Sequence, residues 1–276
     1  NGLDIIIEKY IHTYLELGEF LVIREKNKIN TNFFRSLINK LSELEDTQLK
    51  KISKFRNRFS IRNKNYDNEY DRRIDLIHNK PMLNKKEEQY INIGEEHWRQ
   101  RYYHKCFDIS SIDEINDICL NYMEGIKWVF NYYFNECISW QWCYRYNHGP
   151  TLYDLCNFLK NTNEIDSIKI SKGKPNKPFY QLISVLPPNS CSLLPQSYQK
   201  LVTNIESPII EYFPIDYEYD MYFKRYFWQC PPILPYINDS KLKQVLDKIK
   251  LTNLEKTRNS FGENYELEFK SGLKII

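Results

Sequence analysis

The chain has 276 residues, of which 42% are hydrophobic and 15% aromatic, and its formal net charge is only +3. This length suggests one large domain or two small ones, with enough apolar residues for a sizeable core. The near balance of charge excludes a strongly basic protein, so any surface that binds anions must be local. Glycine is scarce at 8 residues, which disfavours turn-rich all-β folds, and no apolar run is long enough to span a bilayer.

The first predicted element is a helix over residues 3–17, where apolar residues recur at helical spacing up to Gly18. A second helix is predicted over residues 28–52, with Thr31 or Asn30 as its cap. Residues 51–94 change character and are dense in charge and asparagine. Part of this segment is predicted to continue the helix, and its middle to be a solvated, mobile connection.

Helical spacing resumes over residues 95–107 and is clearest over residues 111–135. Ser111 and Glu114 have the spacing of a capping box at the start of the latter helix. Its apolar stripe is broad enough to be buried on more than one side. Another helix is predicted over residues 151–160, capped by Thr151.

Most of the prolines lie within residues 171–236, where short helices at 179–186 and 195–203 alternate with extended pieces. A final helix is predicted over 239–250, with Asp239 or Ser240 as its cap. These patterns predict a mainly α fold, an irregular multi-helix domain with a Pro-rich C-terminal half. Its short extended segments are expected to be confined to about 205–236, with 165–175 as a second location.

The sequence shows no complete active site. It has no Gly-rich phosphate loop, no Gly-x-Ser-x-Gly elbow and no carboxylate group of the kind that two-metal nucleases need. The five histidines are scattered, which argues against a zinc site. The seven cysteines include no Cys-x-x-Cys pair, and we interpret them as free buried thiols in a reducing compartment.

One short stretch concentrates flat side chains. Residues 137–150, CISWQWCYRYNHGP, contain two tryptophans, two tyrosines, an arginine and a histidine immediately before a Gly-Pro break. Two interpretations are open from the residues alone. The rings either pack in a core, or they stack on something flat such as nucleic acid bases.

The longer stretch around it, NYMEGIKWVFNYYFNECISWQWCYRYNHGPTLYDL over 121–155, resembles the hallmark of the Xrn family of 5′→3′ exoribonucleases. In that family a helix with a Gly-x-x-Trp step runs into Ser-Trp-x-Trp-Tyr-Tyr-Pro-Tyr-His-Tyr-Ala-Pro. The stretches EEHWRQRYYHKCF, GKPNKPFYQLISVLPPNSCSLLPQSYQKLV, ESPIIEYFP and FWQCPPILPYIND resemble further family segments in the same order. Matching positions in the hallmark are Gly125, Trp128, Tyr132, Tyr133, Ser139, Trp140, Trp142, Tyr144, Tyr146 and Pro150.

The chain departs from the family pattern at a few positions. Arg145 stands where the family has proline, Asn147 where it has histidine, and His148 where it has tyrosine. Tyr222 and Phe223 replace an Asn-Gly turn. These differences indicate a divergent member, for which the usual handling of substrate is an open question, and they leave the expected fold unchanged.

The resemblance implies a division of the chain into three parts. Residues 1–50 resemble helices at the end of the nuclease core, 51–94 form the charged connection, and 95–276 form the Xrn-type helical domain. The family keeps its catalytic carboxylates, its Mg²⁺ ions and its pocket for the 5′-monophosphate in an N-terminal region that precedes residue 1. The implied enzyme is therefore a longer 5′→3′ exoribonuclease, with no catalytic or metal-binding residue in this chain.

The function that the resemblance implies is to buttress the nuclease core and help admit single-stranded RNA with a 5′-monophosphate end. The expected partners are that RNA and the nuclease region of the same polypeptide, without a membrane. The expected location is intracellular, cytoplasmic or nuclear, with a viral origin left open. The alternative is a noncatalytic RNA- or protein-binding scaffold, from a degenerate or stand-alone homologue.

The candidate nucleic-acid-binding residues are Trp140, Trp142, Arg145, His148 and Arg101. One tryptophan of the aromatic stretch is expected to stack on a base, and Trp140 is preferred over Trp142. Arg145 is a candidate phosphate contact, with a surface salt bridge as the alternative. Arg101, with Arg99 and Lys105, could face the RNA backbone, although such helix clusters are usually solvated. The remaining tryptophans, Trp98, Trp128 and Trp228, are assigned to the core.

Overall fold

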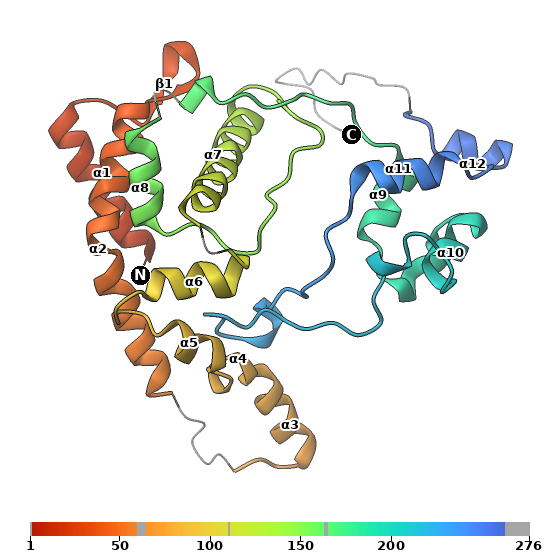
Figure 1. Ribbon diagram of the computed structural model, residues 1–276, viewed down its shortest axis with the longest axis horizontal. Coiled ribbons are helices and arrows are strands. Elements are labelled where there is room, and N and C mark those ends of the chain that lie inside the picture. Colours follow the sequence, from red (N-terminus) through yellow and green to blue (C-terminus); the bar gives the residue numbers. More distant parts are fainter. Residues whose placement is uncertain (1, 60–64, 110, 163–164, 263–276) are drawn as a thin grey trace, which may run out of the picture. The chain divides into compact units, whose positions relative to one another are not determined.

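The computed structural model describes residues 2–59, 65–109, 111–162 and 165–262, which form α-helices, short 3-10 turns and two strands of two residues each (Figure 1). The predicted mainly α class is confirmed. The chain divides into two units, the first made of residues 1–174 and 220–231, the second of 175–219 and 232–276. Among the described residues, no helix combines the length and the apolar character needed to cross a bilayer.

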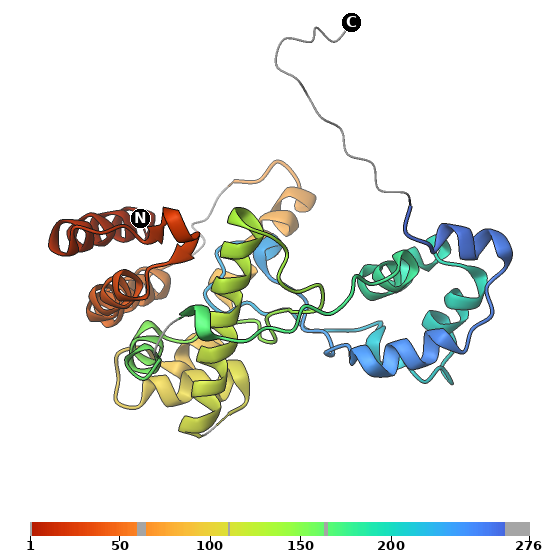
Figure 2. The same cartoon turned by 90° about the horizontal axis from the view of Figure 1, so that it is seen from above.

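Helix α2 (Thr31–Asn57) is the central helix of the N-terminal part of the first unit. Its cap is Asn30, whose side-chain oxygen accepts the backbone N–H of Phe33 at 3.1 Å. Helices α1 (Gly2–Leu17) and α8 (Leu152–Lys160) both pack against α2, as Figures 1 and 2 show. The apolar face that these contacts bury consists of Phe33, Phe34, Leu37, Ile38 and Leu41.

A small hairpin joins α1 to α2. Strand β1 (Val22–Ile23) pairs antiparallel with β2 (Lys28–Ile29) across the 3-10 turn η1 (Arg24–Lys26). Asn27 closes this turn with φ +46°, a left-handed conformation that asparagine adopts more easily than most residues. The expectation that extended segments are confined to about 205–236 and 165–175 is therefore wrong at this hairpin, whose strands are too short for an alternating pattern to show.

Helix α7 (Ile112–Phe134) confirms the predicted capping box. Ser111 accepts the backbone N–H of Glu114 at 3.2 Å, and the Glu114 carboxylate accepts the backbone N–H of Ser111 at 3.2 Å. The helix packs against α8, and the face that it buries contains Ile118, Cys119, Met123 and Phe130. Val129 and Tyr133 of the predicted stripe are exposed, so the stripe is only partly buried in this chain.

Most of the described part of the charged segment 51–94 is helical. Helix α2 continues to Asn57, and α3 (Glu69–His78), α4 (Lys80–Leu83) and α5 (Lys86–Ile91) precede α6 (Trp98–Phe107). Residues 60–64, in the predicted mobile middle of this segment, lie outside the described residues. The division of the chain at residues 50 and 94 stays a prediction.

A buried ion pair holds this segment. The Arg56 Nε lies 2.8 and 2.9 Å from the two carboxylate oxygens of Glu88, and its Nη2 also contacts that carboxylate. The same guanidinium donates to the carbonyl of Lys224 at 2.8 Å and to that of Pro81 at 3.2 Å. Arg56 therefore joins the end of α2 to α4, to α5 and to the segment 220–231.

The second unit is a smaller helical group. It contains α9 (Pro178–Val185), η3 (Pro188–Leu193), α10 (Gln196–Thr203), η4 (Ile210–Tyr212), α11 (Asp239–Asp247) and α12 (Asn253–Arg258). The cap of α11 is Asn238, which accepts the backbone N–H of Lys241 at 3.0 Å, so the prediction of Asp239 or Ser240 was wrong by one residue. Helix α12 was not predicted, although Thr252 and Glu255 form a capping box at its start.

Replacing Glu88 by glutamine is expected to lower the free energy of unfolding of the first unit by about 3–5 kcal/mol, because the Arg56 charge stays buried without its anion. All five tryptophans belong to the first unit, so tryptophan fluorescence during urea unfolding follows this unit. The matched control is Glu69→Gln, which removes exposed pairs with Arg72 and Arg73 worth less than about 1 kcal/mol. Equal losses in the two variants would contradict the structural role of Arg56.

Candidate nucleic-acid interface

The aromatic segment 137–150 follows the end of α7, and its inner rings stack on that helix. The Trp142 ring stacks on Trp128 at a centroid distance of 6.0 Å and 24° between planes, and Trp128 stacks on Tyr132 at 5.2 Å and 9°. The Trp142 N–H donates to the Glu124 carboxylate at 2.9 Å, and the Trp128 N–H donates to the Ser139 carbonyl at 2.8 Å. Both indoles are thus satisfied and fixed in place.

Gly125 makes room for this stack. A Cβ atom at position 125 would lie 2.7 Å from Cη2 of Trp142, closer than two carbon atoms can pack. The Gly-x-x-Trp step in the sequence therefore has a steric reason: glycine leaves the space beside α7 that the Trp142 ring fills.

Trp140 differs from Trp142 because its ring is open to solvent. Its residue is 51% exposed, while its backbone N–H donates to the Lys172 carbonyl at 2.9 Å. The next two backbone N–H groups, of Gln141 and Trp142, donate to the Ser139 hydroxyl at 3.3 and 3.0 Å. Of the two rings, that of Trp140 is therefore the more open, and it stands on a hydrogen-bonded backbone; its stacking on a base stays a prediction.

The three other predicted residues have different environments. Arg145 is exposed, and its backbone N–H donates to the Asn121 side chain at 3.0 Å. Arg101 is half-buried, and its guanidinium donates to the carbonyls of Ile91 at 3.0 Å and Glu96 at 2.8 Å. Arg101 therefore ties the segment before α6 to that helix, which is a structural task, whereas the Arg145 side chain reaches solvent.

His148 points into the protein. Its Nε2 lies 2.9 Å from Oδ2 of Asp220, and the two side chains are only 14% and 9% exposed. The imidazole also contacts the rings of Tyr102, Phe107 and Tyr222 edge-on. Burial alone would raise the pKa of Asp220, but the hydrogen bond and charge of His148, with the backbone N–H of Tyr222, hold that pKa below its ordinary value.

A tryptophan assigned to the core is the most exposed of the five. Trp228 lies in η5 (Phe227–Gln229), within the loop 220–231, and is 73% exposed, so its core assignment was wrong. Its ring stacks on Tyr226 at 6.0 Å and 12°. The Arg225 guanidinium lies 4.7 Å from the Tyr226 centroid and 4.7 Å from that of Phe59. We call Phe59, Arg225, Tyr226 and Trp228 the Trp228 stack.

Sequence reasoning missed the Trp228 stack because its inner member, Phe59, lies far away along the chain. A local signal does exist, since Arg225, Tyr226 and Trp228 place a cation and two rings within four consecutive positions. Arg225 is itself held by a hydrogen bond from its Nη1 to the Asn79 side chain at 3.2 Å. A cation between two rings gains from both, which orders the support under Trp228.

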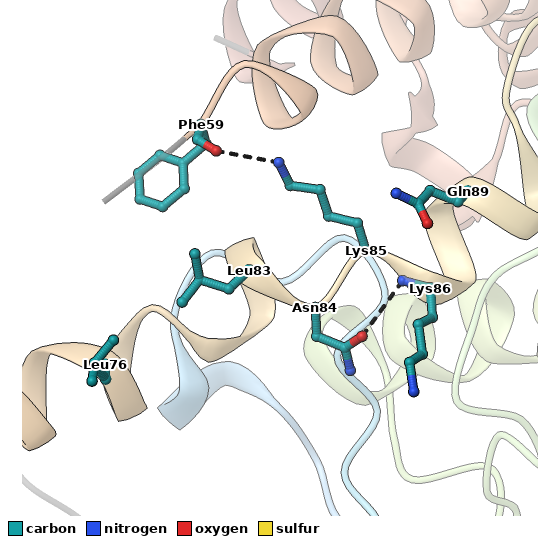
Figure 3. Close-up of a pocket in the computed structure, with 7 residues that line it drawn as sticks. All are labelled: Phe59, Leu76, Leu83, Asn84, Lys85, Lys86 and Gln89. Carbon is teal, nitrogen blue, oxygen red and sulfur yellow. Dashed lines mark hydrogen bonds between the residues drawn. The ribbon is translucent and has the colours of Figure 1, made fainter. Parts of the chain in front are cut away.

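An open pocket of about 660 Å³ lies beside Phe59. Figure 3 shows its lining residues, which are Phe59, Leu76, Leu83, Asn84, Lys85, Lys86 and Gln89. The Lys85 ammonium donates to the carbonyls of Asn57 and Phe59, both at 3.3 Å, so it holds the chain after α2. None of the five predicted site residues lines this pocket. Within the described ranges, no group of three or more His, Cys, Asp or Glu side chains is placed to hold a metal ion.

Comparisons with known proteins give a consistent result. A family model described as the Xrn1 helical domain matches residues 22–271. The 5′-3′ exoribonuclease 2 of Arabidopsis thaliana is 36% identical over 216 residues, which are 73% of this chain and 21% of that protein. The 5′-3′ exoribonuclease 2 of Gallus gallus is 36% identical over 180 residues, 63% of this chain and 18% of that protein.

A third relative is the 5′-3′ exoribonuclease 1 of Saccharomyces cerevisiae, which is 32% identical over 178 residues, 63% of this chain and 11% of that protein. The chain therefore spans about a fifth, or less, of the length of these relatives. They come from a plant, a bird and a yeast, and give no support to a viral origin.

Replacing Trp142 by alanine is expected to cost about 3 kcal/mol or more of stability, because it removes a packed ring and one of the two donors to the Glu124 carboxylate. The same change at Trp140 or Trp228 is expected to cost less than about 1 kcal/mol, since these rings bury much less surface. Urea unfolding followed by circular dichroism measures the three variants on one scale. Similar losses for Trp140→Ala and Trp142→Ala would show that both rings belong to the core.

Proposed function

Because the chain belongs to the family of the Xrn1 helical domain, we propose that it is the helical region of a longer 5′→3′ exoribonuclease. Its relatives are 5′-3′ exoribonucleases, which supports this proposal, and the chain accounts for only about a fifth of their length. The catalytic carboxylates and the Mg²⁺ that they would bind are proposed to lie in the nuclease region of the longer protein. Hydrolysis would then occur outside this chain.

The proposed task of the chain is to support that nuclease region and to help admit single-stranded RNA with a 5′-monophosphate end. Helix α1 offers a surface for the first part of this task. Its outward side carries exposed apolar residues, including Leu3, Ile7, Ile11 and Leu15. A cluster of large apolar side chains of this kind is typical of a surface that another part of a protein covers, and we propose that the nuclease region covers it.

The observation that carries the RNA-binding proposal is the pair of open rings on ordered supports, Trp140 and Trp228. Stacking of a base on an aromatic ring contributes about 1–3 kcal/mol and tolerates any base, which suits an enzyme that degrades RNA of any sequence. A support that is already ordered loses less entropy on binding. The hydrogen-bonded backbone at Trp140 and the Arg225 contacts beside Trp228 supply such order.

The other candidate residues take supporting parts in this proposal. The exposed Arg145 is proposed to contact a phosphate. Two cations near Trp228 are proposed to do the same: Lys80, which lies over the Phe227 ring, and Arg225. Trp142 is proposed to support the stacked segment without contacting a base, since its ring and N–H are already engaged. Arg101 and His148 are likewise engaged within the protein and are proposed to order it.

Alanine at Trp140 or at Trp228 is expected to weaken binding of a 5′-phosphorylated single-stranded oligoribonucleotide by about 5- to 100-fold, the effect of losing one stacked base. Fluorescence anisotropy at one fixed salt concentration measures the change. Tyr153→Ala is the matched control for Trp140, because Tyr153 is 50% exposed and should leave affinity unchanged. Wild-type affinity in both tryptophan variants would contradict the proposed stacking role.

The chain alone is expected not to release mononucleotides from RNA, whichever divalent metal is supplied, because it is proposed to lack the carboxylate set for two-metal hydrolysis. The longer protein should release them from 5′-phosphorylated RNA in Mg²⁺. Thin-layer chromatography of end-labelled RNA distinguishes the two. Metal-dependent release by residues 1–276 would contradict this assignment, and the acidic stretch 211–220 would be the first place to search for ligands.

A further inference from the structure

The contact between His148 and Asp220 joins two parts of the proposed RNA-binding surface. His148 lies near the end of the aromatic segment that carries Trp140, and Asp220 begins the loop 220–231 that carries Trp228. Their side chains meet at 2.9 Å, and both are nearly buried. His148 stands where the related hallmark stretch has tyrosine, so this chain places a titratable cation at a position that is otherwise neutral.

Asp220 holds the base of the loop in three ways. Its backbone N–H donates to the carbonyl of Pro231 at 3.0 Å, which brings the two ends of the loop together. Its Oδ1 accepts the backbone N–H of Tyr222 at 3.0 Å, and its Oδ2 faces His148. A change at His148 therefore acts on the carboxylate that organises the start of the loop.

The turn that follows is strained. Phe223 has φ +58°, in the left-handed region that is unfavourable for a bulky residue, and it stands where the related segment has glycine. Arg56 stabilises the turn from one side, since its guanidinium lies 5.3 Å from the Phe223 centroid and donates to the Lys224 carbonyl at 2.8 Å. A strained turn persists only when its surroundings hold it. On the other side of the turn, the hydrogen bond from the backbone N–H of Tyr222 to Asp220 helps to hold it.

The groups around the pair leave few candidates for a change of charge near neutral pH. Helix α6 contributes Tyr102 and Cys106, and the aromatic segment contributes Tyr144. The loop contributes Tyr222, Lys224 and Cys230. The Arg56–Glu88 pair lies behind Tyr222. Burial raises the pKa of each of these tyrosines and thiols, that of Cys106 to about 12. They keep their neutral forms between pH 5 and 8, the range in which a histidine side chain changes charge.

We propose that His148 is a positioning residue, which fastens the base of the loop 220–231 through Asp220 and thereby makes base stacking at Trp228 depend on pH. The inference rests on the proposed function, because it concerns the same RNA-binding loop. A protonated imidazole places a full positive charge 2.9 Å from the carboxylate, and this ion pair holds the carboxylate more strongly than a neutral ring does. Loss of that proton weakens the fastening and releases the strained turn.

At low pH the stabilising contribution of the His148–Asp220 pair is also lost. The pKa of Asp220 is lowered in the folded protein, so its stabilising contribution is present above the ordinary pKa of a carboxyl group. That contribution is lost as the pH falls through the lowered value. The fastening is therefore strongest where the Asp220 carboxylate is ionised and the imidazole carries its proton.

The test compares the wild-type chain with His148→Tyr, which restores the residue of the related stretch, at about pH 6 and pH 8. Hydrogen exchange read by mass spectrometry reports the protection of residues 220–231 without RNA, after correction for the intrinsic effect of pH. Anisotropy with a single-stranded oligoribonucleotide reports affinity. In the wild type both are expected to fall by about three- to tenfold from pH 6 to pH 8, the effect of losing one ion pair. In His148→Tyr both should stay level, since a tyrosine hydroxyl does not titrate in this range.

Two results would overturn the inference: a wild-type loop whose protection does not change with pH, or a His148→Tyr variant with the wild-type dependence. If circular dichroism shows that His148→Tyr fails to fold, Asp220→Asn replaces it and must also abolish the dependence. Loop protection that follows pH while Trp140→Ala and Trp228→Ala both leave RNA affinity unchanged would support the fastening and contradict the proposed stacking role. The two ideas can therefore fail separately.

Discussion

The buried pair of Arg56 and Glu88 is the contact on which the rest of the first unit depends. Removing two charges from water is costly, and the cost is offset only when every remaining hydrogen-bonding group finds a partner. Arg56 meets this condition because Glu88, Pro81 and Lys224 all accept from its guanidinium. The pair is fully satisfied only when α2, the segment of α4 and α5, and the loop 220–231 are all in place. The ordered conformation of the loop therefore depends on this buried ion pair.

The two open tryptophans share one design although they lie on different segments. In each case an outer ring lies in solvent while its immediate surroundings are fixed, by backbone hydrogen bonds at Trp140 and by ring–cation contacts at Trp228. The inner rings, Trp128 and Trp142, have their N–H groups satisfied by protein acceptors. The inner rings supply the packing, so the outer rings can contact a ligand without any loss of that packing.

Local signals in the sequence predicted the helices well, because periodicity and caps act within one turn of chain. The capping box at Ser111 and Glu114 and the cap at Thr151 are where the pattern placed them. What failed depends on contacts between distant residues. Trp228 looks like a core residue in a Pro-rich stretch, and its exposure and its support from Phe59 exist only in three dimensions. The contact of His148 with Asp220 likewise joins residues far apart along the chain, and the expected contact of His148 with RNA stays a prediction.

The division of the chain bears on how the protein is made. The first unit is completed by residues 220–231, which follow the first half of the second unit in the sequence. A ribosome builds the chain from its N-terminus, so the carbonyl of Lys224 emerges long after Arg56 and Glu88 have done so. Until then the guanidinium lacks one of its acceptors and the Tyr222 position in the core next to Ile91 and Trp98 is empty. The first unit of the nascent chain therefore stays incomplete until residues 175–219 of the second unit have been synthesised.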